Sequence, residues 1–218
     1  MHLSVIAPHP DDEALGAEGF MHRVHRESAK VTVCTVTGVR AEENRGSVVE
    51  EKRREALAAH RLLGVDESIF LDLPAKELDT VPLERVARPF AAAIKAKPTH
   101  VLVNHPHDLH VDHRRTFEAA MVATRPYTNC VDHLGSFQVS SSSESGEADA
   151  PAFSPTLLVD IAGTYPGAKQ DAPRCQATEI KAPPHCGSPE AVATHACYWG
   201  HGVRLKAAEP HQASRSYA

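Results

Sequence analysis

Short apolar, β-branched runs alternate with longer helical stretches along the first half of the chain, and this alternation constrains the fold most. The apolar runs lie at 3–7, 30–36, 68–73 and 99–104, and the helical stretches lie at about 13–28, 47–63 and 79–97. Strands that are almost continuously apolar are typical of a parallel sheet covered on both faces. Because crossovers between parallel strands are right-handed, we predict an α/β, Rossmann-like fold: a doubly wound, mostly parallel sheet with helices on both faces.

The second half of the chain is less regular, but it contains no linker or internal repeat that divides it. Residues 140–155 are polar, low in complexity and rich in serine, and we expect a mobile loop there. Residues 156–161 read as a further strand, and residues 189–199 read as a helix that begins at Ser188 and Pro189. We therefore expect one domain that spans residues 1–218.

Charge and composition exclude several classes of partner. The formal net charge is −5, from 23 basic and 28 acidic residues without a large basic block, so nucleic acid is not an expected partner. No apolar run approaches the roughly 20 residues of a membrane span. The start of the sequence lacks the pattern of a signal peptide and the five cysteines are scattered, which predicts a reduced, cytoplasmic protein. The oligomeric state stays open, with a homo-oligomer among the alternatives.

Two polar clusters directly follow predicted strands. PHPDDE at 8–13 follows the first strand, and HPHDLHVDH at 105–113 follows the fourth. Ligands of open α/β sheets bind beyond the carboxyl ends of the strands, so both clusters are expected to converge at one edge of the sheet. The chain also has 15 histidines, more than packing requires, which favours a metal site.

The spacing within both clusters suits a metal ion. His9 and Asp12 lie three residues apart where a turn enters a helix, and His110 and His113 repeat this spacing at the start of another predicted helix. Zinc prefers histidine nitrogen and carboxylate oxygen, and a catalytic zinc site has three protein ligands and a water. Either pair alone is more often a helix cap with a surface histidine, so the interpretation depends on their convergence. The sequence lacks the G-x-S-x-G and G-x-G-x-x-G motifs that serine hydrolases and dinucleotide-binding proteins carry after a strand.

PHPDDEALG together with HDLHVDH resembles the PIG-L/LmbE family of zinc-dependent N-acetylglucosaminyl deacetylases, and the likeness extends over almost the whole chain. RREALAAHRLLGV resembles the second helix of that family, FLDLP its third strand and YWGHGVRLKAAEP its C-terminal element. The resemblance implies a zinc-dependent hydrolase that removes an N-acetyl group from an N-acetylglucosamine-type aminosugar. The aminosugar could be free, nucleotide-linked or part of a glycoconjugate or natural product.

The resemblance also implies roles for individual residues of the two clusters. Asp11 becomes the general base that takes a proton from the attacking water. His110 faces the developing oxyanion, and Asp112 orients His110 and keeps it protonated. The implied ligands of Zn²⁺ are His9, Asp12 and His113.

The residues that would read the substrate depart from the family pattern. Members of the family commonly have a substrate-binding arginine on their second helix. At the corresponding position this sequence has Lys52, and Arg53 follows it. Glu18 stands where a glycine is frequent, Ala75 where an acid is common, and Gly187 where an arginine is usual. The resemblance therefore implies the reaction type more firmly than the substrate.

Two other functions stay open. The same chemistry could act on another amide, such as a thiol conjugate or an acylated natural product. A non-catalytic binding protein with a vestigial metal site belongs to a different class. Asp11 argues against that class, because a structural metal needs no base beside it.

Overall fold

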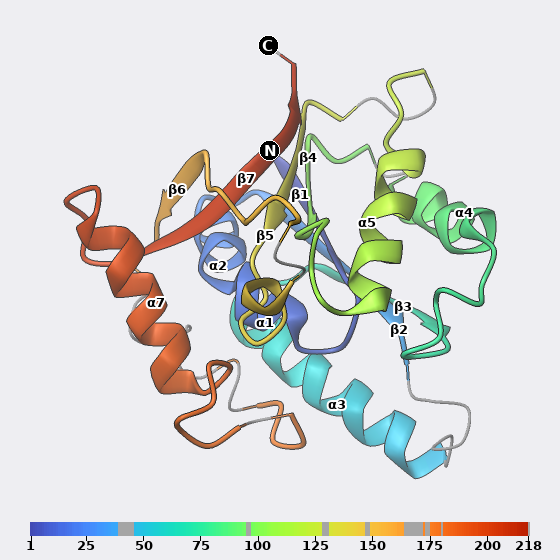
Figure 1. Ribbon diagram of the computed structural model, residues 1–218, viewed down its shortest axis with the longest axis horizontal. Helices are drawn as coiled ribbons and strands as arrows, with labels where there is room; N and C mark the ends of the chain where they lie inside the picture. Colours follow the sequence, from blue (N-terminus) through green and yellow to red (C-terminus); the bar gives the residue numbers. More distant parts are fainter. Residues whose placement is uncertain are drawn as a thin grey trace.

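The structure is a computed structural model, and it describes residues 1–38, 46–94, 97–127, 131–146, 149–163, 172, 175–179 and 181–217. Within these residues one seven-stranded sheet has the order β3-β2-β1-β4-β5-β7-β6 (Figure 1). The strands are β1 (His2–Ala7), β2 (Lys30–Thr37), β3 (Glu67–Leu73), β4 (His100–Asn104), β5 (His133–Phe137), β6 (Leu157–Asp160) and β7 (Ala208–Ser216). The helices are α1 (Asp12–Gly16), α2 (Glu18–Arg26), α3 (Gly46–Leu63), α4 (Leu83–Ala93), α5 (Val111–Ala123), α7 (Pro189–His201) and the short 3-10 helix η3 (Ser143–Ser145).

The sheet is mostly parallel, as the sequence predicts. β1 pairs in parallel with β2 and β4, β2 pairs with β3, and β4 pairs with β5. β7 is antiparallel to both β5 and β6. The Rossmann-like fold class is therefore confirmed. Sequence patterns do not predict β5 and β7, because neither has the long apolar run of a strand buried on both faces.

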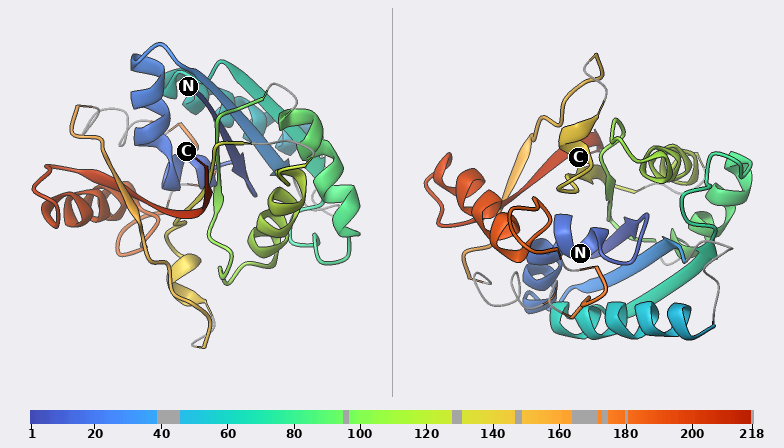
Figure 2. Two further views of the ribbon diagram at one scale, coloured as in Figure 1. Left: turned by 90° about the horizontal axis from the view of Figure 1, so that it is seen from above. Right: turned by 60° about the horizontal axis from the view of Figure 1, so that its bottom comes forward.

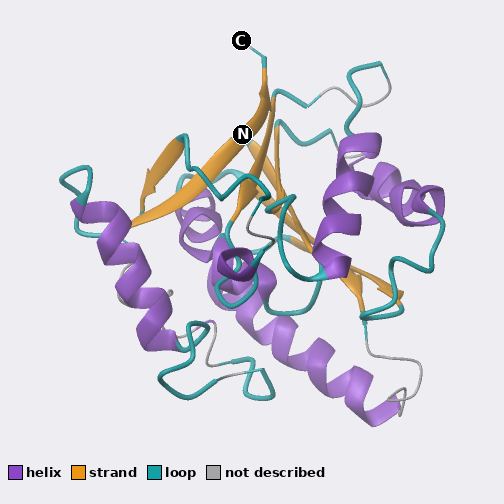
Figure 3. Cartoon of the chain, in the orientation of Figure 1, coloured by secondary structure: helices purple, strands orange, loops and turns teal. Residues whose placement is uncertain are grey.

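Helices cover both faces of the sheet (Figures 2 and 3). Successive side chains of a strand point to opposite faces, so each buried strand supplies two cores. The core beneath α4 and α5 includes Ile6, Cys34, Val36, Phe90, Val101 and Val103. The core beneath α2 and α3 includes Leu3, Val5, Met21, Val31, Val33 and Leu63. Helix α7 lies beside β6 and β7 (Figure 1), over a smaller cluster of Val159, Ile161, Ala196 and Ala207.

The helix predicted at 13–28 is divided into α1 and α2 at Ala17, where φ is −140°. α1 approaches β5 so closely that a Cβ on Gly16 would lie 2.2 Å from the Phe137 ring. The first N–H groups of a helix have no partner within it. In α2, the N–H groups of Gly19 and Phe20 donate hydrogen bonds to the Glu209 carboxylate on β7. Tertiary contacts therefore replace one long helix by two shorter ones.

The predicted C-terminal helix is confirmed. α7 begins at Pro189, and the Ser188 hydroxyl accepts a hydrogen bond from the Ala191 N–H at 3.2 Å. Serine at the cap and proline in the first turn are the local signals that predict the start of this helix.

The serine-rich segment predicted as a mobile loop is described at 140–146 and 149–155. Its first residues form a tight turn, in which the N–H groups of Ser142 and Ser143 both donate to the Val139 carbonyl, at 3.2 and 3.0 Å. Val139 and Ser140 are buried, so the segment is fixed to the body of the protein at this end. Its mobility and the single-domain organisation stay predictions.

Two expectations from composition also bear on the structure. Among the described residues, no helix combines the length and apolar character needed to cross a membrane. Within the same residues, Cys34, Cys175, Cys186 and Cys197 form no disulfide. Cys130 lies outside the described residues.

Glu209 should contribute measurably to stability, because its buried carboxylate accepts hydrogen bonds from the N–H groups of Gly19 and Phe20, at 2.7 and 2.8 Å. Glu209→Ala leaves both donors without this partner and should lower the free energy of unfolding by about 2–4 kcal/mol. The exposed Glu190→Ala is the matched control; it removes only an acid in the first turn of α7 and should change the free energy of unfolding by less than about 1 kcal/mol. Urea denaturation measures both values, and equal effects would contradict the assignment.

Candidate active site

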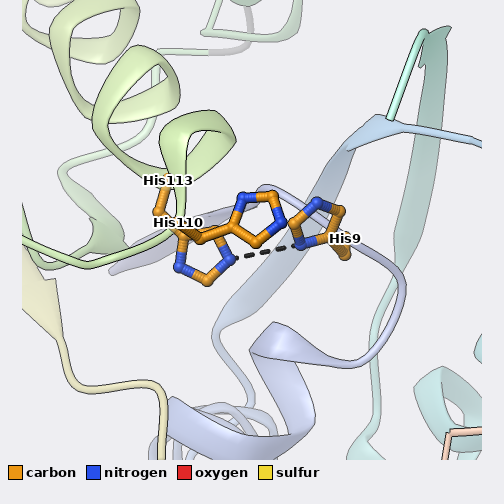
Figure 4. A group of neighbouring side chains, drawn as sticks. All are labelled: His9, His110 and His113. Atoms are coloured by element: carbon orange, nitrogen blue, oxygen red, sulfur yellow. Dashed lines mark hydrogen bonds between the residues drawn. The ribbon is translucent and has the colours of Figure 1, made fainter. Parts of the chain in front are cut away.

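The two polar clusters meet at the carboxyl edge of the parallel strands. The first occupies the turn between β1 and α1, and the second leads into α5 after β4, the strand that pairs with β1. Figure 4 shows the rings of His9, His110 and His113 directed toward one another, His9 from the first cluster and the other two from the start of α5. The ring centroids of His9 and His113 lie 5.1 Å apart, and those of His9 and His110 lie 4.6 Å apart.

One atom from each predicted metal ligand forms a nearly equilateral group, which we call the ligand group. His9 Nδ1, Asp12 Oδ2 and His113 Nε2 lie 3.2 Å from one another in each pair. In a tetrahedral zinc site with bonds of 2.0–2.1 Å, two ligand atoms are about 3.3 Å apart. The nitrogen and carboxylate donors therefore fit a small tetrahedral cation in both chemistry and spacing. A second set, His9, His110 and His113, offers ligand atoms within 4.8 Å of one another and is looser than that spacing.

A second carboxylate lies behind each histidine of this group. His9 Nε2 contacts Asp112 Oδ2 at 3.0 Å, and His113 Nδ1 contacts Asp108 Oδ2 at 3.1 Å. Asp108 and Asp112 are both buried. A carboxylate on the far nitrogen of a histidine fixes its tautomer and ring orientation, and this arrangement is typical of histidines that bind metals.

The position of Asp112 corrects the prediction that it orients His110. The Asp112 carboxylate accepts hydrogen bonds from the N–H groups of Lys76 and Leu78 and contacts His9. Only its backbone N–H reaches His110, donating to Nδ1 at 3.1 Å, so His110 is the N-cap of α5. The reason is helix geometry: side chains two positions apart do not face each other.

Negative charge dominates the electrostatics of the ligand group. Burial lowers the pKa of His9, but hydrogen bonds with Asp112 and Asp12 outweigh burial and raise the pKa to about 9. Burial likewise opposes protonation of His113, and Asp12 with Asp108 raises its pKa to about 10. The pKa of Asp12 is well below its usual range, since the two histidines more than offset its burial. An excess of carboxylates around these nitrogens is what a bound cation neutralises.

Two other titratable residues border the ligand group. Burial, and then the charge of Asp12, raises the pKa of Asp11 to about 8. Burial, and then the neighbouring histidine rings, lowers the pKa of His110 to about 4. The Asp112 carboxylate opposes this lowering of the His110 pKa but is outweighed by burial and the histidine rings, and the protonation of His110 during the reaction stays a prediction.

Helix α1, which carries Asp12, is anchored by the next residue. Glu13 is fully buried, and its Oε1 accepts hydrogen bonds from His60 Nε2 at 3.3 Å and Gln176 Nε2 at 3.2 Å. His60 lies on α3 and contacts the Ser68 hydroxyl through Nδ1 at 2.8 Å. The acid that ends the PHPDDE motif thus joins three elements beside the site.

A cavity of about 240 Å³ opens beside the ligand group. Asp11, His110, Ala75 and Lys76 contribute to its wall, together with Ser141, Ser142, Lys52 and Glu179. Glu18, Ala75 and Gly187 depart from the family pattern, and one of them, Ala75, lines this cavity. Gly187 lines a smaller adjoining cavity that shares Asp11, and Glu18 is buried at the start of α2.

The two predicted substrate-binding residues separate in the structure. Lys52 lines the cavity, where its Nζ forms an ion pair with Glu179. Arg53 pairs with Asp72 at 2.5 Å and lies over the Phe70 ring, 5.1 Å from its centroid. These contacts hold Arg53 beside the neighbouring strand β3, so the structure brings only Lys52 to the cavity.

Sequence reasoning missed two acids at the site. Asp108 lies inside the HDLHVDH motif and could have been found as a carboxylate five residues before His113. Glu179 has no local signal, because it comes from an irregular segment and reaches the cavity only through the tertiary structure.

Comparisons with known proteins place the chain among related folds. A conserved protein from Thermus thermophilus is 24% identical, with a TM-score of 0.78 over 100% of this chain and 96% of that one. N,N'-diacetylchitobiose deacetylase from Pyrococcus horikoshii is 21% identical, with a TM-score of 0.77 over 97% and 83%. GalB, the 4-carboxy-2-hydroxymuconate hydratase from Pseudomonas putida, is 20% identical, with a TM-score of 0.73 over 100% and 98%.

These likenesses show the fold, and a hydratase among them shows that the fold alone does not decide the reaction. The comparison with protein families is more specific. The family described as PIG-L, GlcNAc-PI de-N-acetylase, matches residues 4–124. This match covers more than half of the chain and includes both polar clusters. The chain belongs to the PIG-L (GlcNAc-PI de-N-acetylase) family.

Proposed function

We propose that the protein is a zinc-dependent hydrolase that removes the N-acetyl group from an N-acetylglucosamine-type aminosugar. The observation that carries this proposal is the group of His9 Nδ1, Asp12 Oδ2 and His113 Nε2, each 3.2 Å from the others. The group borders a cavity that Asp11 also lines, so ligands and a base lie together. Membership of a family described as a de-N-acetylase supports the reaction type.

The ligand group suits zinc better than a hard cation. His9, Asp12 and His113 hold the metal, while Asp112 and Asp108 orient the two rings from behind. Magnesium and calcium prefer sites made of oxygen ligands, whereas two imidazoles and one carboxylate are a common donor set of catalytic zinc. When bound, zinc supplies Lewis acidity toward water and toward the amide carbonyl.

Asp11 and His110 carry out the proton transfer and hydrogen bonding. The Asp11 carboxylate takes a proton from the attacking water and passes it to the leaving amine. His110 Nδ1 accepts a hydrogen bond from the Asp112 N–H, so a neutral His110 ring carries its proton on Nε2. The Nε2–H group then donates a hydrogen bond to the oxygen that becomes negative in the transition state. His110 acts here as a neutral donor rather than as an imidazolium.

The cavity wall supports a polar substrate. Lys52 and Glu179 form an ion pair there, and Ser141 and Ser142 also line the wall. Sugar hydroxyls need donors and acceptors of this kind, whereas an apolar acyl conjugate would need an apolar wall. These contacts fit the hydroxyl groups of an aminosugar.

Acetate release tests the proposed reaction directly. The purified protein should release acetate from N-acetylglucosamine or from one of its nucleotide-linked or oligosaccharide forms. Chelator should abolish the release and added Zn²⁺ should restore it, because the ligand group then regains its cation. Release only from an N-acetylated thiol conjugate would identify the alternative amidase, and a zinc-loaded protein inactive on every amide would contradict a hydrolase.

Metal content tests the ligand group. Protein purified without chelator should contain about one zinc per chain, since three ligands form one open site. His113→Ala should lose this zinc, because two remaining ligands hold it weakly. The exposed His201→Ala is the control and should retain it. Elemental analysis measures all three proteins, and zinc retained in His113→Ala would remove His113 from the ligand set.

The adjacent acids should separate in their effects. Asp11→Asn should keep zinc and lower kcat by roughly 10²–10⁴-fold, because the base is lost while the ligands stay. Asp12→Ala should lose both zinc and activity. Steady-state kinetics and metal analysis on the same preparations decide the assignment, which is wrong if both variants lose zinc equally.

A further inference from the structure

Asp108 joins the ligand group to the serine-rich segment. Its side chain is buried, with the residue only 1% exposed. Oδ1 accepts hydrogen bonds from the Ser142 hydroxyl and from the His110 N–H, the latter at 3.1 Å. Oδ2 accepts from the Ser143 hydroxyl at 2.9 Å and contacts His113 Nδ1 at 3.1 Å. Each carboxylate oxygen is thus held by one serine and by one group of the HDLHVDH segment.

The two serines are themselves held in place by backbone contacts. The Ser143 hydroxyl accepts a hydrogen bond from the Val139 N–H at 2.9 Å, which leaves its own proton for Asp108. The Ser142 carbonyl accepts from the Leu109 N–H at 3.2 Å. The turn at 139–145 is therefore fastened to Leu109, the residue after Asp108, and its Ser142 and Ser143 hydroxyls are directed at the carboxylate.

The orientation of Asp108 matters because of what His113 must do. The carboxylate contacts Nδ1, so Nε2 of the same ring is directed to Asp12 and His9, each at 3.2 Å. Groups that orient a metal-binding histidine in this way typically change metal affinity by 10–100-fold when they are substituted. A buried carboxylate that loses hydrogen-bond donors turns toward others or takes up water, and the ring that it orients then moves with it.

We infer that Asp108 is the positioning residue of His113, and that Ser142 and Ser143 hold Asp108, so the serine turn sets how tightly zinc is bound. This inference rests on the metal site of the proposed function. Ser142 also lines the cavity, so one residue connects the wall that faces the substrate with the carboxylate behind a metal ligand. A segment whose composition indicates a simple polar loop thereby belongs to the metal centre.

The test measures the zinc dissociation constant by competition with a chromophoric chelator. Ser143→Ala and Ser142→Ala should each weaken zinc binding by about tenfold, and Asp108→Asn by roughly 10–100-fold. Ser143→Thr keeps a hydroxyl and should bind zinc like the unsubstituted protein. Ser145→Ala is the matched control, since Ser145 is exposed in the same turn and should leave the constant unchanged.

Cobalt absorption provides a second readout that general destabilisation does not imitate. Replacement of zinc by Co²⁺ should give tetrahedral visible bands in the unsubstituted protein and altered bands in Ser143→Ala. A Ser142→Ala/Ser143→Ala double variant with unchanged zinc affinity and unchanged bands would overturn the inference, even if Asp108→Asn failed to fold.

The measurement also separates this inference from the proposed function. Zinc affinity is determined without substrate, so a protein that follows the predicted pattern but releases no acetate overturns only the proposed reaction. An unsubstituted protein that binds no zinc overturns both.

Discussion

The Asp12 carboxylate lies between two imidazole nitrogens, and the architecture of the site depends on this contact. One carboxylate oxygen meets His9 and His113 at 3.2 Å each, and both rings have a further carboxylate behind them. Without a cation, the neighbouring Asp12, Asp108 and Asp112 carboxylates raise the pKa of His9 to about 9 and that of His113 to about 10. A metal ion held between these side chains would neutralise the same carboxylates.

The fold supplies the contact by bringing two distant segments to neighbouring strand ends. β1 and β4 pair in parallel, so the turns that follow them lie side by side although about 100 residues separate them in the sequence. The short helix α1 carries Asp12. It is fixed by the hydrogen bonds of the Glu13 carboxylate and by the close packing of Gly16 against Phe137. The sheet orders the strand ends, and buried polar contacts then set the angles of the side chains.

Most of the fold could be predicted because its signals are local. Apolar runs identify β1 to β4, helix periodicity identifies α3, and the Ser188 cap with Pro189 identifies α7. β5 and β7 could not be predicted in this way, because the partners that make them strands lie far away in the sequence. The division of the helix at 13–28 also required distant residues: Phe137 excludes a side chain at position 16, and Glu209 accepts the first amides of α2.

The sequence by itself determined which residues of the two clusters gather at the sheet edge, because motif spacing and strand ends are properties of short segments. Only the tertiary structure decided their partners: Asp112 faces His9, Asp108 faces His113, and Arg53 pairs with Asp72 in an adjoining cavity. At a helix start, the local backbone angles set where each side chain points and therefore which group it meets. His9 and Asp112 come from different clusters and meet only through packing, so linear spacing carries no record of their contact.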